Sequence, residues 1–334
     1  MAEHAPQPPV AAPQVEDDAV SITPESVASS KASLRSSIME FRKENGRTYH
    51  RLSDGKYFGP NDETEQDRLD HAHELWVRTW DGLCNSPKKY GANRVLDVGT
   101  GTGIWSIDYA DEHPEATVIG VDLSPIQPDF VPPNCHFEVD DVDKPWIFSQ
   151  PFDFIFVRAM VGSFRSWPKF LSQAYDNLEP GGYIELHDNN FPAICGDGTM
   201  TEDSYILQWT QNVVKATDAA GQPITTAPSF KRLLQEAGFV DVQERTEYWP
   251  VGTWAADPRQ KNIGLWCAES MTKGIESICM ALFTRMLDWT KEEVLVFCAH
   301  VRDEMKKGKV HAYFLVYSVW GRKPEKEASE PPEA

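Results

Sequence analysis

The chain has 334 residues, and its 51 acidic side chains outnumber its 32 Lys and Arg, for a formal net charge of −19. Hydrophobic residues make up 41% and charged residues 25%, which is typical of a folded globular protein and excludes a fully disordered chain. A surface this acidic repels phosphate backbones, so we expect no direct nucleic-acid partner. No apolar run reaches the ~18 residues of a membrane-spanning helix, so we expect no membrane partner.

Composition predicts disorder at both ends of the chain. Residues 1–32 are rich in Pro, Ala, Ser and acidic side chains without apolar periodicity, and residues 323–334 are similar. Such segments bury too little apolar surface to offset the entropy of ordering. The amino terminus lacks a basic start followed by an apolar core, so we expect no secretory signal.

The six cysteines form no C-x-x-C pair and have no zinc-site spacing, so we expect no metal. Their scatter along a large chain is typical of reduced, mostly buried thiols. The sequence therefore predicts an intracellular, cytoplasmic protein.

The predicted folded body begins with helices and aromatic loops. Residues 33–90 are interpreted as an amino-terminal helical and aromatic segment, with helices over 33–43 and 63–81. In the second helix Leu69, Trp76 and Trp80 share one face, because their spacings fit the helical repeat.

From residue 93, short apolar strands alternate with helices. Strands are predicted over 94–98, 117–121, 136–139, 152–157 and 183–186, with helices over 104–112 and 167–178. This alternation predicts a Rossmann-like α/β domain over 91–322, in which a parallel sheet has helices on both faces. Further along, helices are predicted over 205–219, 229–236 and most of 255–307, and strands over 240–248 and 312–320.

The most informative motif is an apolar strand that runs directly into Gly99, Gly101 and Gly103, followed by a predicted helix. Glycines permit a tight turn and close approach of a ligand, and the helix start offers free N–H groups. The third glycine comes one residue earlier than in the G-x-G-x-x-G loop of dinucleotide-binding proteins, which disfavours a nicotinamide-dependent oxidoreductase. Asp97 precedes the loop, and its carboxylate would repel pyrophosphate and attract a cation. The motif favours S-adenosylmethionine, which carries an ammonium and a sulfonium.

Acidic residues also end the next two predicted strands. Asp122 is placed to accept both ribose hydroxyls, and Asp140 or Asp141 to accept the adenine amino group. Their neighbours Leu123 and Val142 are predicted cofactor contacts too. Each aspartate alone is also typical of a helix cap or a turn, so the interpretation depends on their order along three successive strands.

These motifs resemble those of class I, seven-stranded S-adenosylmethionine-dependent methyltransferases. The resemblance covers about residues 90–320 and includes 178–185, where Glu179 stands in a turn in which the family commonly has Lys. It implies a seven-stranded sheet ending in a hairpin, which 240–248 and 312–320 would supply.

Several segments more closely resemble the fungal LaeA-like methyltransferases: 46–49, 57–62, 65–73, 156–163 and 166–168. This resemblance implies methyl transfer to an oxygen, nitrogen or sulfur atom of a small-molecule acceptor in fungal secondary metabolism. The alternative is a regulatory protein that binds the cofactor but acts mainly through protein partners in the nucleus. The sequence leaves both open.

The resemblance also suggests that residues 33–90 form a lid over the cofactor, and it suggests roles for single side chains. Tyr49 and Tyr57 either close over the cofactor or pack a helix against the sheet, and Arg158 either lines the cofactor cleft or forms a salt bridge at a strand end. His187 and Asp188 follow the fifth strand at the ligand-binding edge, and His187 is the first candidate for a general base. The alternative for His187 is a hydrogen bond to backbone in a loop.

Two long additions, 191–235 and 255–307, are predicted helical insertions that roof the acceptor pocket.

Overall fold

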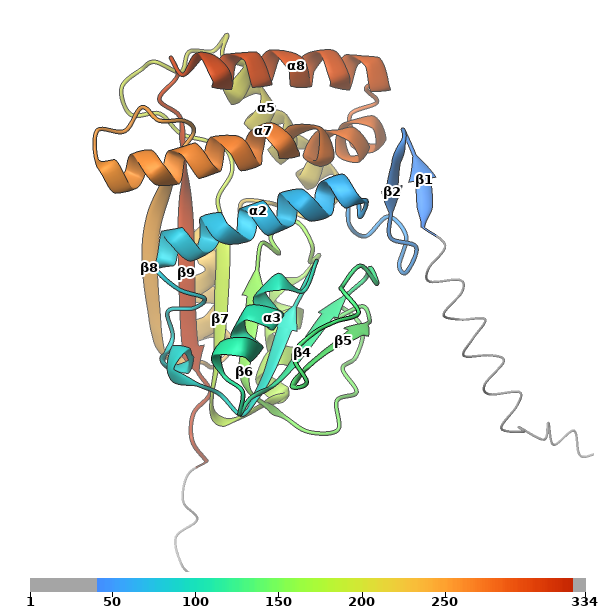
Figure 1. Cartoon of the computed structure of the whole chain (residues 1–334), viewed down its shortest axis with the longest axis vertical. Coiled ribbons are helices and arrows are strands. Elements are labelled where there is room, and N and C mark those ends of the chain that lie inside the picture. Colours follow the sequence, from blue (N-terminus) through green and yellow to red (C-terminus); the bar gives the residue numbers. More distant parts are fainter. Residues whose placement is uncertain (1–40, 327–334) are drawn as a thin grey trace, which may run out of the picture. The chain divides into compact units, whose positions relative to one another are not determined.

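A seven-stranded mixed sheet forms the centre of the fold (Figure 1). The structure, a computed structural model, describes residues 41–326. The predictions for 1–32, for 33–40 and for 327–334 lie outside the described residues. The sheet strands are β3 Arg94–Val98, β4 Thr117–Asp122, β5 Cys135–Val139, β6 Phe152–Arg158, β7 Leu178–Asn189, β8 Val240–Pro250 and β9 Tyr313–Arg322, in the spatial order β5-β4-β3-β6-β7-β9-β8.

Five of these strands are parallel, and the last two close the sheet as an antiparallel pair. β3 pairs with β4 on one side and with β6 on the other, while β5 and β7 extend the sheet outward. β9 runs antiparallel to both β7 and β8. The chain thus returns from β5 across β3 to β6, which makes the carboxyl ends of β3 and β6 the switch point where open α/β sheets bind ligands. The predicted Rossmann-like α/β fold is confirmed.

Helices cover both faces of the parallel strands. Val95 packs in an apolar cluster with α3 (Ile104–Glu112), whereas its neighbour Leu96 packs in another with α4 (Trp167–Asp176) and α6 (Phe230–Glu236). Successive strand side chains point to opposite faces, so a strand covered on both faces must be apolar at nearly every position.

Four further helices form a layer across one end of the sheet: α2 Glu63–Trp80, α5 Tyr205–Ala219, α7 Pro258–Met286 and α8 Lys291–Lys307. Figure 1 shows α2, α7 and α8 stacked over the carboxyl ends of the strands. A third apolar cluster, which includes Trp76, Trp209 and Phe283, holds this helical layer together. None of the helices in the described chain is long and apolar enough to cross a membrane. Two short 3-10 helices, Pro87–Tyr90 and Ala227–Ser229, complete the elements.

The helix predicted over 33–43 is wrong at its described end, where the chain forms a hairpin. β1 (Arg42–Glu44) pairs antiparallel with β2 (Arg47–Tyr49). Asn45 and Gly46 turn between them with φ angles of 52° and 86°. Asn-Gly adopts such left-handed angles easily, and this local turn preference outweighs the weak helical pattern.

The predicted insertion 255–307 divides into α7 and α8. Thr290 and Glu293 form a capping box that starts α8, because each side chain bonds the backbone N–H at the other residue. Lys323, in the tail predicted to be disordered, donates to the carbonyls of Tyr175 and Leu178 at 2.6 and 2.7 Å. The ordered chain therefore continues past β9.

Candidate functional site

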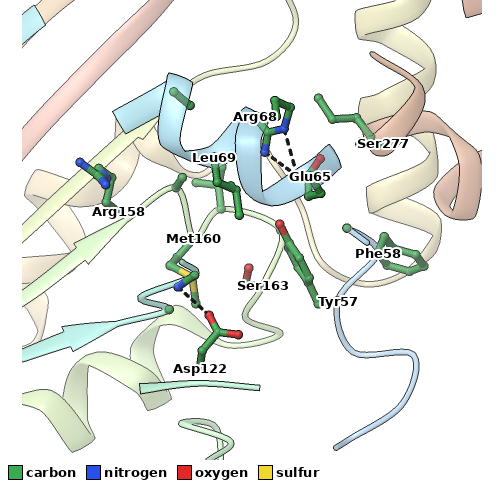
Figure 2. Close-up of a pocket in the computed structure, with 18 of the residues that line it drawn as sticks. Tyr57, Phe58, Glu65, Arg68, Leu69, Asp122, Arg158, Met160, Ser163 and Ser277 are labelled. Carbon is green, nitrogen blue, oxygen red and sulfur yellow. Dashed lines mark hydrogen bonds and ion pairs between the residues drawn. The ribbon is translucent and has the colours of Figure 1, made fainter. Parts of the chain in front are cut away.

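A cavity of about 320 Å³ lies between the carboxyl ends of the parallel strands and the helical layer (Figure 2). Gly99, Gly101 and Asp122 line it from the sheet side. Glu65 of α2 and Ser277 of α7 line it from the helix side. The volume suits a small molecule or a cofactor, and the location is the switch point of the sheet.

The glycine loop brings bare backbone to the cavity. Gly99, Gly101 and Gly103 have φ angles of 72°, 59° and 84°. These lie in the left-handed region, which residues other than glycine rarely adopt. A Cβ at Gly99 would overlap the sulfur of Met160, and one at Gly103 would overlap the ring of Phe137. The first two glycines line the cavity, whereas Gly103 starts α3 and serves the packing of that helix against β5.

Asp122 presents a partly buried carboxyl at the end of β4. One of its oxygens accepts the Gly101 N–H and the other accepts the Ser124 N–H, both at 2.9 Å. Burial raises its pKa to about 6, against the effect of these two bonds. Each oxygen keeps a lone pair, so the carboxylate can still accept two ligand hydroxyls. Leu123 follows it in the cavity wall.

The two aspartates after β5 have different places. Asp140 and Val142 line the cavity. Asp141 is not among the lining residues, because its carboxylate accepts hydrogen bonds from Ser53 at 2.7 Å and from Lys56. Burial alone would raise the pKa of Asp141, but these bonds hold it below its usual value. Asp141 therefore anchors the segment before α2, and the geometry does not favour it as a cofactor contact.

The two predicted tyrosines also lie in different places. Tyr57 lines the cavity, and Figure 2 shows its hydroxyl directed toward Glu65 and Arg68. Tyr49 is buried outside the cavity wall, with the Arg285 guanidinium 5.1 Å from its ring centre. Of the two alternatives, Tyr49 takes the packing role.

Asp97 is buried behind the glycine loop. Its Oδ2 accepts the hydroxyls of Thr100 and Ser106 at 2.6 and 2.8 Å, so it braces the loop from within. Burial raises its pKa. Asp97 is not among the residues that line the cavity, so its carboxylate cannot contact a cationic ligand directly in this geometry.

Arg158 lines the cavity at the end of β6. It donates to Nδ1 of His73 at 3.1 Å, and Nε2 of His73 lies 2.9 Å from Asp108. Burial lowers the pKa of Arg158 to about 10, which leaves it charged at neutral pH. Of the two alternatives for Arg158, this position favours the cavity.

His187 lies in the core and not in the cavity wall. Its Nε2 is 2.6 Å from Glu185, and its ring lies within 5.9 Å and 5.5 Å, centre to centre, of Trp76 and Trp80. Burial lowers its pKa, so we infer a neutral ring that donates from Nε2. The predicted base has no access to a substrate in this geometry.

Asp188, the next residue, does line the cavity. Its carboxyl accepts the N–H of Val161 at 2.7 Å and that of Asn189 at 3.0 Å. Burial raises its pKa to about 7. Of the two neighbours at the end of β7, Asp188 and not His187 is therefore the ionisable residue that reaches the cavity.

α2 belongs to the segment predicted as a lid, but the sequence assigned no role in the cavity to its individual side chains. Most of the side chains that α2 supplies recur at helical spacing; the full set is Glu65, Arg68, Leu69, Ala72, His73, Leu75 and Trp76. The face predicted from the spacing of Leu69, Trp76 and Trp80 rests on apolar residues alone. The charged pair at the start of α2 was the signal for a second role.

Comparison with known proteins identifies the family. A family model described as a methyltransferase domain matches residues 45–244. The chain is 39% identical over 313 residues to methyltransferase pytC of Aspergillus terreus, covering 93% of this chain and 96% of that protein. The chain belongs to the methyltransferase family. The predicted family and enzyme class are confirmed.

This methyltransferase is also 38% identical over 290 residues to the secondary metabolism regulator LAE1 of Cochliobolus heterostrophus, covering 84% of this chain and 94% of that protein. Among solved structures, phosphoethanolamine N-methyltransferase 2 of Haemonchus contortus with S-adenosyl-L-methionine matches with a TM-score of 0.44 and 17% identity. That match covers 82% of this chain and 55% of the other.

The cavity fits S-adenosylmethionine, the cofactor of this class of methyltransferase. The glycine loop lines the cavity with bare backbone at Gly99 and Gly101, and Asp122 retains free lone pairs beside it. Asp140 and Val142 line the next strand end.

Proposed function

We propose that this methyltransferase transfers the methyl group of S-adenosylmethionine to an oxygen, nitrogen or sulfur atom of a small molecule in fungal secondary metabolism. One observation carries the proposal: a single cavity joins the glycine loop and Asp122 to apolar side chains of the helical layer. Cofactor and acceptor would then meet inside one enclosure, which is what direct transfer requires.

The residues that line the cavity support a separate role for each part of the site. Asp122 would hold the ribose, Asp140 and Val142 would contact the adenine, and the glycine loop would let the cofactor lie against backbone. Tyr57 would help to exclude water from above the loop. S-adenosylmethionine supplies an activated methyl group, so positioning by the protein accounts for much of the expected rate.

A general base is needed only when the acceptor must lose a proton. We assign that role, where it is needed, to Asp188 and not to His187, because only Asp188 lines the cavity. A carboxyl with a pKa of about 7 is well matched to taking up a proton near neutral pH.

The experiment is calorimetry followed by a labelled-methyl assay. S-adenosylhomocysteine should bind and NAD should not. Incubation of the protein and methyl-labelled S-adenosylmethionine with a fungal extract should then label a small molecule. Binding of NAD, or no binding of S-adenosylhomocysteine, would contradict the proposed cofactor site.

A second candidate is a regulator that binds the cofactor but acts through protein partners. The relative named as a secondary metabolism regulator favours it. A pull-down that recovers protein partners, together with an extract that stays unlabelled, would support this alternative. In either case we propose that the protein works in the cytoplasm or the nucleus. Its free cysteines, five of the six buried, support this proposal.

A further inference from the structure

The helix-side part of the cavity is mostly apolar. Its walls include Phe58, Trp76, Phe191, Val213, Trp249 and Met271, which come from six different elements or connecting segments of the chain. Such a lining gains free energy by covering apolar ligand surface and offers little to a strongly hydrated one.

One charged pair interrupts this apolar wall. Nε and Nη2 of Arg68 donate to Oε1 of Glu65 at 3.0 and 2.6 Å (Figure 2). Glu65 is only 2% exposed, and its Oε2 has no hydrogen-bond partner within residues 41–326. A buried carboxylate oxygen without a partner is costly, so it is a site where a ligand donor would be favoured.

The pair belongs to the helical side of the cavity. Arg68 packs against α7 at Gly274, where a Cβ would lie 2.7 Å from Cδ of Arg68. In Figure 2, Glu65 and Arg68 lie beyond the hydroxyl end of Tyr57, and Asp122 lies on the opposite side of the view. The free oxygen of Glu65 therefore belongs to the helix side of the cavity, and the ribose position proposed at Asp122 belongs to the sheet side.

We propose that this region is the acceptor subsite and that it selects an uncharged, largely apolar small molecule with one hydroxyl or N–H group that donates to Oε2 of Glu65. This inference rests on the proposed function. The ligand should be uncharged because Arg68 already balances Glu65. Apart from this pair, the helices add one ionisable side chain to the cavity wall, His73, and burial holds its pKa below the usual value.

The test measures binding of three small probes to protein saturated with S-adenosylhomocysteine. The probes are 2-naphthol, 2-methoxynaphthalene, which lacks the donor, and the anion 2-naphthoate. By calorimetry 2-naphthol should bind about tenfold more tightly than either of the others, the fold-change expected for one hydrogen bond to a charged group. Absence of saturable 2-naphthol binding at millimolar concentration, or tighter binding of the anion, would overturn the proposal.

The matched variants are Glu65→Gln and Glu292→Gln, the latter at an exposed position on α8. Glu65→Gln should reduce the preference for 2-naphthol over 2-methoxynaphthalene about fivefold and leave S-adenosylhomocysteine affinity unchanged. Glu292→Gln should change neither. An unchanged preference would refute the role of Glu65. Weaker S-adenosylhomocysteine binding would instead assign Glu65 to the cofactor.

A second pair of variants keeps the proposal testable if Glu65→Gln does not fold. Ile278→Ser places a hydroxyl in the apolar wall and should weaken both neutral probes severalfold. Val296→Ser, at a residue 59% exposed on α8, should not. If Ile278→Ser and Val296→Ser bound the neutral probes equally well, the probes would bind outside this part of the cavity. Failure of S-adenosylhomocysteine itself to bind would defeat the proposed function, whereas failure of the probes alone defeats only this inference.

Discussion

The hydroxyl of Ser53 donates a hydrogen bond of 2.7 Å to the carboxylate of Asp141, just beyond the end of β5. Lys56 bonds the same carboxylate and lies 3.0 Å from Asp143. Because Tyr57 follows directly and lines the cavity, this contact holds one wall of the site in place.

Asp141→Asn should loosen this wall. Loss of the charge removes about 1–3 kcal/mol of charge-assisted hydrogen bonding, so the segment around Lys56 should open more often. We expect faster proteolysis between β2 and α2 and severalfold weaker S-adenosylhomocysteine binding. Glu138→Gln, at an exposed position on β5, is the control and should behave as wild type. Equal proteolysis of the two variants would show that Asp141 does not anchor the segment.

Cofactor affinity should depend on pH through Asp122. Burial raises the pKa of this carboxyl to about 6, while the Ser124 and Gly101 N–H groups and His50 lower it and Asp97 raises it. Ribose hydroxyls donate to the ionised form, so binding should be strong above pH 6 and weaken below it, by at most about tenfold per pH unit. Calorimetry with S-adenosylhomocysteine from pH 5 to pH 8 measures this dependence. Asp122→Asn should bind more weakly and show a flat profile over that range, and a slope that persists in this variant would assign the titration to another group.

Gly99→Ala tests the fit of the glycine loop. The added Cβ is strained at a φ of 72° and would overlap the sulfur of Met160, pushing that side chain into the cavity. We expect at least a tenfold loss of S-adenosylhomocysteine affinity. The double variant Gly99→Ala/Met160→Ala should recover part of it, because the obstructing side chain is gone. No recovery would mean that backbone strain alone causes the loss.

Sequence patterns predicted the layout of the sheet well because local and global signals agree there. The fully apolar β6 and the alternation of strands with helices both require a covered parallel sheet. The same patterns predicted that glycines and aspartates gather at the ends of β3, β4 and β5.

The exact position of each acid depends on tertiary contacts that no local pattern contains. Asp140 and Asp141 are adjacent and chemically alike, yet only Asp141 meets Ser53 and Lys56, which are more than 80 residues away in the chain. His187 and Asp188 point to opposite faces of β7, so a shift of one residue decides which side chain reaches the cavity. Residue type alone favours the histidine, whereas the strand register places the aspartate there.

Glu185 and His187 should prove essential for stability and dispensable for cofactor binding. Glu185 is fully buried and accepts the N–H groups of Asn85 and Ser86 at 2.7 and 2.9 Å, as well as the His187 ring. Glu185→Ala leaves these donors unpaired in the core, so the free energy of unfolding should fall by about 3–5 kcal/mol.

His187→Ala should cost about 2–4 kcal/mol of stability, through the cavity between Trp76 and Trp80 and the lost bond to Glu185. Burial holds the pKa of His187 below its usual value, so the unfolded chain binds this proton more readily. The contribution of neutral His187 to the free energy of unfolding is therefore fully present above the ordinary histidine pKa of about 6.5. It is lost as the pH falls below that value. Chemical denaturation at pH 5.5 and at pH 7.5 tests this direction. The free energy of unfolding should be lower at pH 5.5, and the difference between the two pH values should be smaller in His187→Ala than in the wild type. A variant with unchanged stability but an altered pH profile of turnover would restore His187 as the base.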